Sequence, residues 1–308
     1  MSDPTPPVVL TVAGTDSGGA AGTAADLATI SHLGAHGACV VTAVTAQDTL
    51  GVRAVHPVPV EVVEAQLDAV FDDLPVAAVK TGMLGSPEVV ALVARRVAAT
   101  GVPLVVDPVL VATSGAVLGG AEVVRAYREH LLPVATVATP NTDEARALLS
   151  SDDQGQSQTR SRGERDGTGA HDAPELARQL ARQLSARGVR VLVTGGESGT
   201  DWLALPGAEP LALRHPSVAT RHDHGTGCTH SSALATHLAH GRPLGEAAAL
   251  AAAYVAGQLA TSNRWRLGRG RGPVAHTLPG HTLPTHTQSA PQAVTRTPHA
   301  SIDRGVHA

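Results

Sequence analysis

This chain of 308 residues contains very few aromatic residues and few cysteines. Only 2% of its residues are Phe, Trp or Tyr, so a core must be built from Val, Leu and Ala. Two cysteines, Cys39 and Cys228, make no disulfide framework, which fits a reducing cytoplasm. No apolar run reaches the roughly 18 residues that span a bilayer, and the N-terminus lacks the basic and apolar regions of a signal peptide. We therefore expect a cytoplasmic protein without a membrane segment.

Positive charge is also scarce. Lys80 is the only lysine, and the formal net charge is −4, which argues against a dedicated nucleic-acid-binding protein. Hydrophobic residues make up 43% of the chain, enough for one large domain or two small ones. We expect no nucleic-acid partner.

Apolar runs alternate with amphipathic stretches along most of the chain. Val8–Ala13 has the composition of a buried strand, and Ala20–Leu33 that of a helix. Cys39–Ala46 is expected as the second strand, and Ser86-Pro87-Glu88 is a typical helix start. The alternation predicts an α/β fold with a mostly parallel sheet and helices on both faces. Further strands are expected at 76–79, 102–106, 134–138, 189–194, 202–205 and 211–214, and further helices at 61–74, 89–99, 121–132, 142–149, 174–187, 226–240 and 244–262.

Two segments break this pattern. Residues 150–173 are rich in Ser, Gln, Gly, Asp and Arg and are expected to form a flexible insertion. Residues 277–308 are rich in Pro, His and Thr and are expected to be a disordered tail. The remainder of 1–276 is predicted to be one folded domain.

The stretch His224–Thr229 stands directly before an Ala- and Leu-rich run with helical character. Gly225, Thr226 and Gly227 at a helix start would expose backbone N–H groups to an anion such as a phosphate. Cys228 would lie in the first turn, where the pKa of a thiol is lowered. An anion site beside an activated side chain is typical of phosphoryl transfer. A glycine-rich turn with a buried cysteine is the alternative.

Further candidate residues follow the first two strands. The glycine-rich segment 14–22 is neither a Walker A loop nor a clean dinucleotide motif, but it allows close backbone approach to a small ligand. Asp26, on the next helix, could accept a hydrogen bond from a ligand or could be a solvated carboxylate. Gln47 offers both a donor and an acceptor, which suits an aminopyrimidine or pyridine ring, although a satisfied loop amide is the alternative.

Three oxygen-bearing side chains follow later strands. Asp107 ends one strand, Asn141 ends another, and Glu144 stands one helical turn farther on. Such oxygens suit Mg²⁺, directly or through water, beside nucleotide phosphates. Asn141 and Glu144 also have the spacing of a helix capping box, and both interpretations can hold together.

Several motifs in order give the chain a resemblance to a known family. From about Val8 to His276, apart from the insertion, it resembles the hydroxymethylpyrimidine/phosphomethylpyrimidine kinases of thiamine biosynthesis. The motifs that carry the resemblance are Ala13–Gly22 with Ala25–Leu27, Thr42–Thr49, Lys80–Leu84, Val106–Val109, Thr139–Asn141 with Glu144, His224–Thr229 and Gly270–Val274.

The resemblance implies a fold, an activity and a set of roles. The fold would be ribokinase-like and usually dimeric. The activity would be the ATP- and Mg²⁺-dependent phosphorylation of 4-amino-5-hydroxymethyl-2-methylpyrimidine and then of its monophosphate to the diphosphate. Cys228 would take the position of the catalytic base, and Gly225, Thr226 and Gly227 would form the anion hole. The residues implied to contact the pyrimidine are Ala21, Gln47, Met83 and Val109, with Asp26 as a further contact.

The chain departs from this family at residues expected to handle phosphate charge. Thr113 and Thr194 stand where the family often has lysine, and Glu197 stands where it usually has histidine. Two alternatives stay open. One is a pyridoxal or pyridoxine kinase, whose relatives share the loop that carries Cys228. The other, which Thr194 and Glu197 motivate, is a pyrimidine-binding protein with degraded catalysis.

Overall fold

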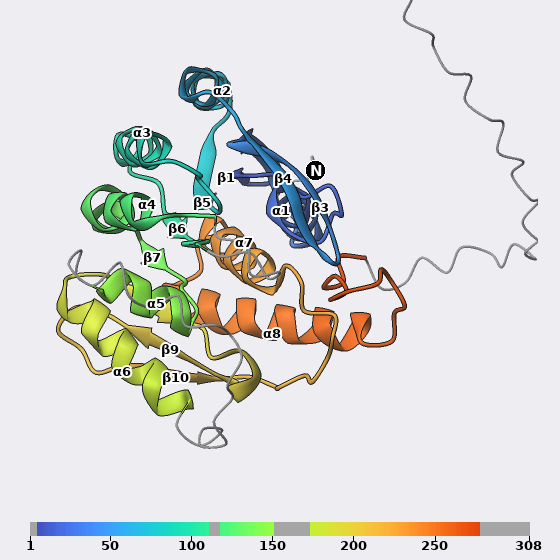
Figure 1. Cartoon of the computed structure of the whole chain (residues 1–308). Coiled ribbons are helices and arrows are strands. Elements are labelled where there is room, and N and C mark those ends of the chain that lie inside the picture. Colours follow the sequence, from blue (N-terminus) through green and yellow to red (C-terminus); the bar gives the residue numbers. More distant parts are fainter. Residues whose placement is uncertain (1–4, 111–117, 151–172, 278–308) are drawn as a thin grey trace, which may run out of the picture. The chain divides into compact units, whose positions relative to one another are not determined.

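The computed structural model describes residues 5–110, 118–150 and 173–277 of the chain (Figure 1). By internal contacts the chain divides into Met1–His276 and Thr277–Ala308, and the fold given below is that of the first unit. The expected insertion 150–173 and tail 277–308 lie almost entirely outside the described residues. Their boundaries therefore stay predictions.

A sheet of eight strands forms the centre of the fold. Neighbouring strands are parallel from β2 across to β8, whereas β9 pairs antiparallel with both of its neighbours. The mostly parallel sheet expected from the sequence is therefore confirmed. Its spatial order is β10 (Leu211–Arg214), β9 (Thr200–Ala204), β8 (Val191–Val193), β7 (Val137–Ala138), β6 (Leu104–Val106), β5 (Val76–Thr81), β1 (Val8–Ala13) and β2 (His36–Val41).

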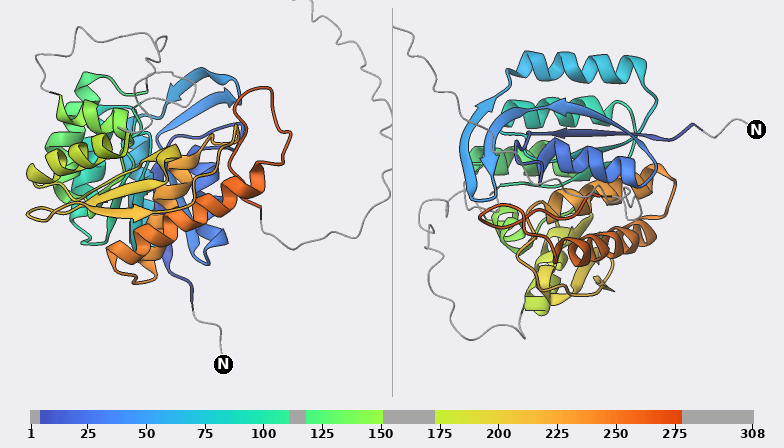
Figure 2. Two further views of the ribbon diagram at one scale, coloured as in Figure 1. Left: turned by 90° about the horizontal axis from the view of Figure 1, so that it is seen from below. Right: turned by 90° about the vertical axis from the view of Figure 1, so that its right-hand side faces the viewer.

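Helices cover both faces of this sheet, as Figures 1 and 2 show from three directions. One layer contains α2 (Val60–Asp73), α3 (Pro87–Ala98), α4 (Ala121–Ala126), α5 (Thr142–Leu149) and α6 (Ala173–Ala186), and the other contains α1 (Gly22–His32), α7 (Thr226–Ala239) and α8 (Leu244–Ser262).

The two-residue period of the strands explains how one sheet supplies two cores. Val9 packs with the α1, α7 and α8 layer, whereas Leu10 and Val12 on the same strand pack with the α2 to α6 layer. All six residues of β1 are buried, so its sequence is an almost unbroken apolar run. Because aromatic residues are scarce, the cores on both faces of the sheet consist mainly of Val, Leu and Ala.

Local signals fix several helix ends. Ser86 caps α3 by accepting a hydrogen bond from the Val89 amide, with Pro87 in the first turn, as expected. The helix expected over 121–132 is α4 followed by a π-helical turn, Tyr127–Leu131, and a 3-10 turn, Leu132–Val134. Pro133 lacks the amide that a continuing helix needs, which explains the irregular end.

The expectation of one strand over Cys39–Ala46 was wrong. The chain leaves the central sheet at Thr42, and β3 (Ala43–Asp48) pairs antiparallel with β4 (Gly51–Pro57) in a separate two-stranded ribbon. Asp48 stabilises the turn between them, because its Oδ1 accepts hydrogen bonds from the amides of Leu50 and Gly51. The ribbon carries Gln47 away from the sheet edge.

The parallel strands β1, β5, β6 and β7 end at one edge of the sheet. The segments that follow them begin with Gly14, Gly82, Asp107 and Thr139, so the candidate residues of widely separated motifs meet there. None of the helices in the described part of the chain is long and apolar enough to cross a membrane.

Candidate active site

The loop at the start of α7, residues 225–227, is the expected anion site and is called the anion loop. Gly225 has φ +87°, and a Cβ on it would stand 1.7 Å from the carbonyl oxygen of Ala20. Only glycine fits this left-handed position against the 20–22 turn. α7 begins at Thr226, so the positive end of its dipole lies at Thr226 and Gly227, as the sequence predicts. Ala21 lies directly beside this loop, with its Cα 3.4 Å from the same Cβ position.

Asp107 lies beneath the loop at the end of β6. Its Oδ2 accepts a hydrogen bond of 3.0 Å from Ser231 on α7, and a Cβ on Gly227 would lie 3.7 Å from that oxygen. Burial raises the pKa of Asp107 to about 6, although Lys80 acts in the opposite direction. The carboxyl group therefore lies close to the expected anion. The positive charge that acts on it, Lys80, is already paired with Asp26.

Asn141 and Glu144 form the capping box of α5. Asn141 Oδ1 accepts hydrogen bonds from the amides of Asp143 and Glu144, and Glu144 Oε2 accepts one from the Asn141 amide. Burial and the nearby Asp107 carboxylate raise the pKa of Glu144 to about 8. Two buried carboxyl groups that repel each other are a donor set that fits a divalent cation. No cluster of three or more His, Cys, Asp or Glu ligands occurs in the described part of the chain, so water would complete the coordination.

Cys228 lies in the first turn of α7, as expected, but its thiol is not activated. Burial raises its pKa to about 12, and the charges of Asp26 and Asp107 add to that effect. Lys80 and a hydrogen bond from the Gly22 amide favour the thiolate, but they do not compensate. The expectation of a lowered pKa was therefore wrong, because burial of the thiol, with the carboxylates of Asp26 and Asp107, outweighs the effect of the helix terminus.

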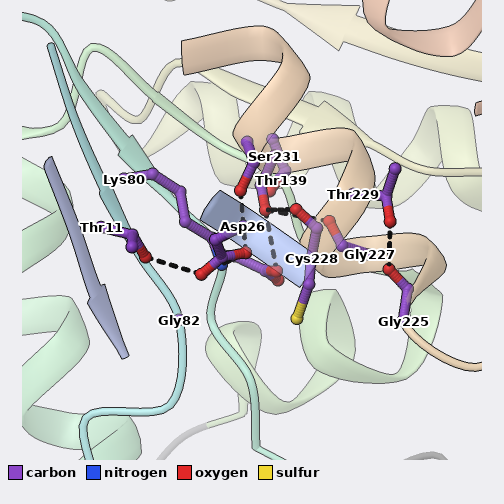
Figure 3. A network of polar contacts seen from close by, with 12 residues as sticks. Thr11, Asp26, Lys80, Gly82, Thr139, Gly225, Gly227, Cys228, Thr229 and Ser231 are labelled. Carbon is purple, nitrogen blue, oxygen red and sulfur yellow. Dashed lines mark hydrogen bonds and ion pairs between the residues drawn. The ribbon is translucent and has the colours of Figure 1, made fainter. Parts of the chain in front are cut away.

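Asp26 occupies the core and not a ligand surface. Its side chain has no solvent exposure, and it pairs with Lys80 at 2.7 Å (Figure 3). Thr11 and Ser232 donate hydrogen bonds to the same carboxylate at 2.6 and 2.8 Å. Thr11, Lys80 and Ser232 are all buried, so the structure gives Asp26 the role of holding Lys80 in place. Neither a solvated carboxylate nor direct contact with a ligand describes this geometry.

Gln47 lies beside the anion loop. Its Nε2 is 2.9 Å from His224 Nε2, and both residues line a cavity of about 290 Å³. The other lining residues come from the ribbon turn and the C-terminal segment, and they are Asp48, Thr49, Leu50, Gly51, Gly270 and Arg271.

The other residues implied to contact the pyrimidine lie outside the lining of that cavity. Met83 is buried, and its Cε stands 2.4 Å from a Cβ position on Gly14. Val109 is half-buried in the segment after Asp107. In the structure Gln47 therefore lies next to His224, and Met83 lies next to Gly14. Thr113 is not among the described residues.

Asp16 is a site residue that sequence reasoning missed. Its carboxylate accepts hydrogen bonds from the amides of Gly18, Ala20 and Ala21, and His224 Nε2 lies 3.2 Å from its Oδ2. Burial acts to raise its pKa, but the hydrogen bonds from His224 and the backbone amides outweigh burial and lower it. Asp16 therefore ties the first glycine-rich turn to the anion loop. An aspartate two residues before a glycine is a turn signal that could have identified it.

A second cavity, which sequence analysis did not identify, is lined by residues of the anion loop. It has a volume of about 230 Å³ and an apolar wall from α8, and Thr226 and Gly227 line it. Thr194 and Glu197 line it too. The remaining lining residues are Gly196, Asp201, His215, Pro216, Val218, Thr220, Asp223, His230, Ala252, Val255, Ala256 and Leu259.

Comparison with known proteins connects this geometry to one family. A family model described as phosphomethylpyrimidine kinase matches residues 16–275. The chain is 45% identical over 276 residues to a hydroxymethylpyrimidine/phosphomethylpyrimidine kinase of Rhizobium meliloti, covering 87% of this chain and 96% of that protein.

Two solved structures are similar in fold. The ADP complex of Bacillus subtilis pyridoxal kinase matches with a TM-score of 0.72 at 29% identity, covering 88% of this chain and 98% of that one. The phosphomethylpyrimidine kinase of Clostridium difficile matches with a TM-score of 0.62 at 31% identity, covering 82% and 98%.

Proposed function

This chain belongs to the phosphomethylpyrimidine kinase family and has the expected ribokinase-like α/β fold, and we propose on that basis that it is an ATP-dependent kinase of the thiamine pyrimidine. Its first acceptor would be the hydroxymethyl group of 4-amino-5-hydroxymethyl-2-methylpyrimidine. Its second acceptor would be the phosphate of the resulting monophosphate, which gives the diphosphate.

One observation supports this proposal most strongly. The loop before α7 borders two cavities, with His224 lining one and Thr226 and Gly227 lining the other. Phosphoryl transfer needs a donor and an acceptor on opposite sides of the transferred group, with positive potential at that group. The start of α7 fits this requirement, because its loop contributes residues both to a cavity that contains Gln47 and to a cavity with an apolar wall.

The two cavities fit the two substrates by their chemistry. Gln47 and His224 offer donors and acceptors to a ring with mixed polar edges. Val255, Ala256 and Leu259 of α8 offer an apolar wall to a planar base. We therefore propose that the pyrimidine binds beside the ribbon and ATP beside α8.

Mg²⁺ fits the buried carboxyl groups beneath the loop. Asp107 and Glu144 would hold it, directly or through water, with Asn141 keeping Glu144 in place through the capping box. A bound Mg²⁺ would neutralise phosphate charge. The chain's own contribution is to orient both carboxyl groups and to keep water from their buried faces.

Homodimer formation and a cytoplasmic location, both expected from the sequence, are part of the proposal. The ribbon leaves Val44, Leu50 and Val55 about half exposed, at 53%, 54% and 43%, which is apolar surface that a second copy could cover. Light scattering of the purified protein would measure the number of chains.

A pyridoxal kinase is the second candidate function. The higher of the two TM-scores belongs to the pyridoxal kinase of B. subtilis, and Gln47 could pair with a pyridine ring as well as with a pyrimidine. The overall identity of 45% to the R. meliloti enzyme favours the pyrimidine.

The deciding experiment measures ATP consumption with three separate acceptors: hydroxymethylpyrimidine, its monophosphate and pyridoxal. We expect turnover with the first two and a lower kcat/KM with pyridoxal. A preference for pyridoxal would support the second candidate. Tight binding of hydroxymethylpyrimidine without ADP release would support a binding protein with degraded catalysis, to which the threonine at position 194 points.

A further inference from the structure

The cavity beside α8 has an unusual charge for a site that takes a nucleotide. Its described lining contains the carboxylates of Glu197, Asp201 and Asp223 but no lysine or arginine. Asp223 is paired with Arg271 on the loop behind it. The groups that can bring positive charge to the described wall are His215 and His230. A polyphosphate entering this cavity therefore meets two histidines held around one buried aspartate.

His215 is placed to be a cation. Its Nε2 lies 3.3 Å from Asp201 Oδ1, and its Nδ1 lies 3.3 Å from the carbonyl oxygen of Pro216. Both ring nitrogens face acceptors, and only the imidazolium can donate from both. The hydrogen bond to Asp201 raises the pKa of His215 against the effect of burial. Because Asp201 carries the opposite charge, this pair alone offers no net charge to a nucleotide.

His230 is the group that can change its charge. It lies one turn after Thr226 on α7, with 5% of its surface exposed. Its Nε2 is buried, has no hydrogen-bond partner and lies 3.7 Å from Asp201 Oδ2. Burial lowers its pKa, and the charge of His215 lowers it further, against the pull of Asp201. This buried ring nitrogen is unsatisfied as it stands, and a proton on it would be directed toward Asp201 Oδ2.

We propose that His230 takes up a proton from solvent when a nucleotide enters this cavity, so that His215, Asp201 and His230 together become a net cation facing the polyphosphate. The inference rests on the proposed function, since it assigns the nucleotide to this cavity. Phosphate charge favours the imidazolium of His230 and acts in the same direction as the charge of Asp201. Each unit by which bound nucleotide raises the pKa of His230 corresponds to about a tenfold gain in affinity.

The test is calorimetric titration of the full chain with ADP in buffers of different ionisation enthalpy. The heat difference between buffers counts the protons taken up. We expect uptake approaching one proton at about pH 7.5 and weaker ADP binding as pH rises from about 6 to about 8, because His230 starts neutral in that range. Unchanged binding across that range, with no proton uptake, would overturn the inference.

Two variants assign the proton to its residue. His230→Gln should remove the uptake and weaken ADP binding by about tenfold at about pH 6.5, where one charge is lost. His215→Gln should leave Asp201 to charge His230 before binding, so that proton uptake falls, and ADP binding should weaken because the remaining pair has no net charge. His237→Gln changes a histidine on the same helix that does not line the cavity, and it should behave as the native chain.

The outcomes separate this inference from the proposed function. Failure of the native chain to bind ADP at all would contradict both. ADP binding with undiminished proton uptake in His230→Gln, or with none in the native chain, would contradict only the role of His230. The proton uptake of the native chain is measured without any variant. The test therefore remains decisive even if the His230→Gln protein does not fold.

Discussion

At the scale of single residues, Lys80 and Asp26 form a buried ion pair whose loss should destabilise the fold. Both side chains are fully buried, and Lys80 also feels the nearby Asp107 and Cys228. Removing one member of a buried ion pair leaves an uncompensated charge, which costs about 3–5 kcal/mol. We therefore expect Lys80→Met to lower the free energy of unfolding by that amount, measured by urea denaturation at neutral pH.

The double variant Lys80→Met, Asp26→Leu is the matched control for this prediction. Replacing both charges removes the attraction together with both desolvation penalties, so it should recover most of the lost stability. An equally unstable double variant would show that the hydrogen bonds from Thr11 and Ser232 to Asp26, and not its charge, carry the stability.

Cys228 has a consequence for each step of the proposed reaction. An alcohol acceptor must lose a proton, whereas a phosphate acceptor is already ionised near neutral pH. We expect Cys228→Ala to lower kcat for the hydroxymethyl acceptor far more than for the monophosphate, measured on each acceptor separately. Equal losses in both steps would rule out a proton-transfer role.

The raised pKa of Cys228 adds a pH criterion. A thiol with a pKa of about 12 stays protonated throughout the neutral range. If the thiolate takes the proton, the rate with the alcohol acceptor should therefore rise about tenfold per pH unit from about pH 7 to about pH 9, and this rise should disappear in Cys228→Ala. A rise that levels off at about pH 8.5 would mean that bound substrates return the thiol to its ordinary range.

At the scale of elements, the conformation of the anion loop depends more on Gly225 than on Gly227. A Cβ at Gly225 would overlap the Ala20 carbonyl in a left-handed conformation, whereas a Cβ at Gly227 would make only ordinary contact with Asp107. Gly225→Ala should therefore lower the free energy of unfolding by at least about 1–2 kcal/mol and displace the loop. Thermal unfolding in the absence of ligand measures the first effect.

Gly227→Ala is the matched control for that prediction. Its added methyl group would face the expected anion without straining the backbone, so ADP affinity should fall while thermal stability is kept. Equal destabilisation by both substitutions would contradict the packing of this loop against the 20–22 turn.

The elements also show which local patterns predict structure. The sequence predicts α5, α8 and β10 to the residue, because a capping box, a long alanine-rich run and flanking turns define them. The ribbon was not predicted. Exposed Val44 lies between buried residues, which is the pattern of any half-buried strand. The local sequence does not indicate whether β3 pairs with β4 or with the central sheet.

At the scale of the whole molecule, local motifs can be identified from the sequence, whereas cavities that combine distant segments cannot. Asp107, Asn141 and the 225–227 loop could be chosen as candidates because each follows a recognisable strand or precedes a helix, and their roles stay predictions. The cavity beside α8 was missed because its wall combines residues near 196, 216, 226 and 256, which no local period connects. Asp26 was misjudged because its partner Lys80 is 54 positions away. Contacts between residues far apart in the sequence determine which side chains are buried, and burial in turn shifts the pKa of ionisable groups.

The pair Asp107 and Glu144 gives the whole molecule a specific dependence on pH. Their pKa values of about 6 and about 8 exceed those of an unfolded chain, about 3.9 and about 4.3. The native state therefore binds more protons than the unfolded state between about pH 4 and about pH 8, and their contribution to stability falls as pH rises through that window. Added Mg²⁺ should offset this loss, since it binds the ionised carboxylates. Differential scanning fluorimetry should show a larger rise in Tm with Mg²⁺ at about pH 8 than at about pH 5.

Variants distinguish a metal site from a general salt effect. Glu144→Gln keeps an acceptor for the Asn141 amide, so the cap survives while the charge is lost, and the response to Mg²⁺ should shrink. Asp143→Asn removes a neighbouring carboxylate whose side chain is 80% exposed, and it should leave the response intact. Sodium chloride at matched ionic strength should not reproduce the effect, because screening acts weakly on buried groups. A rise in Tm that survives Glu144→Gln would place the cation elsewhere and leave Glu144 as a helix cap alone.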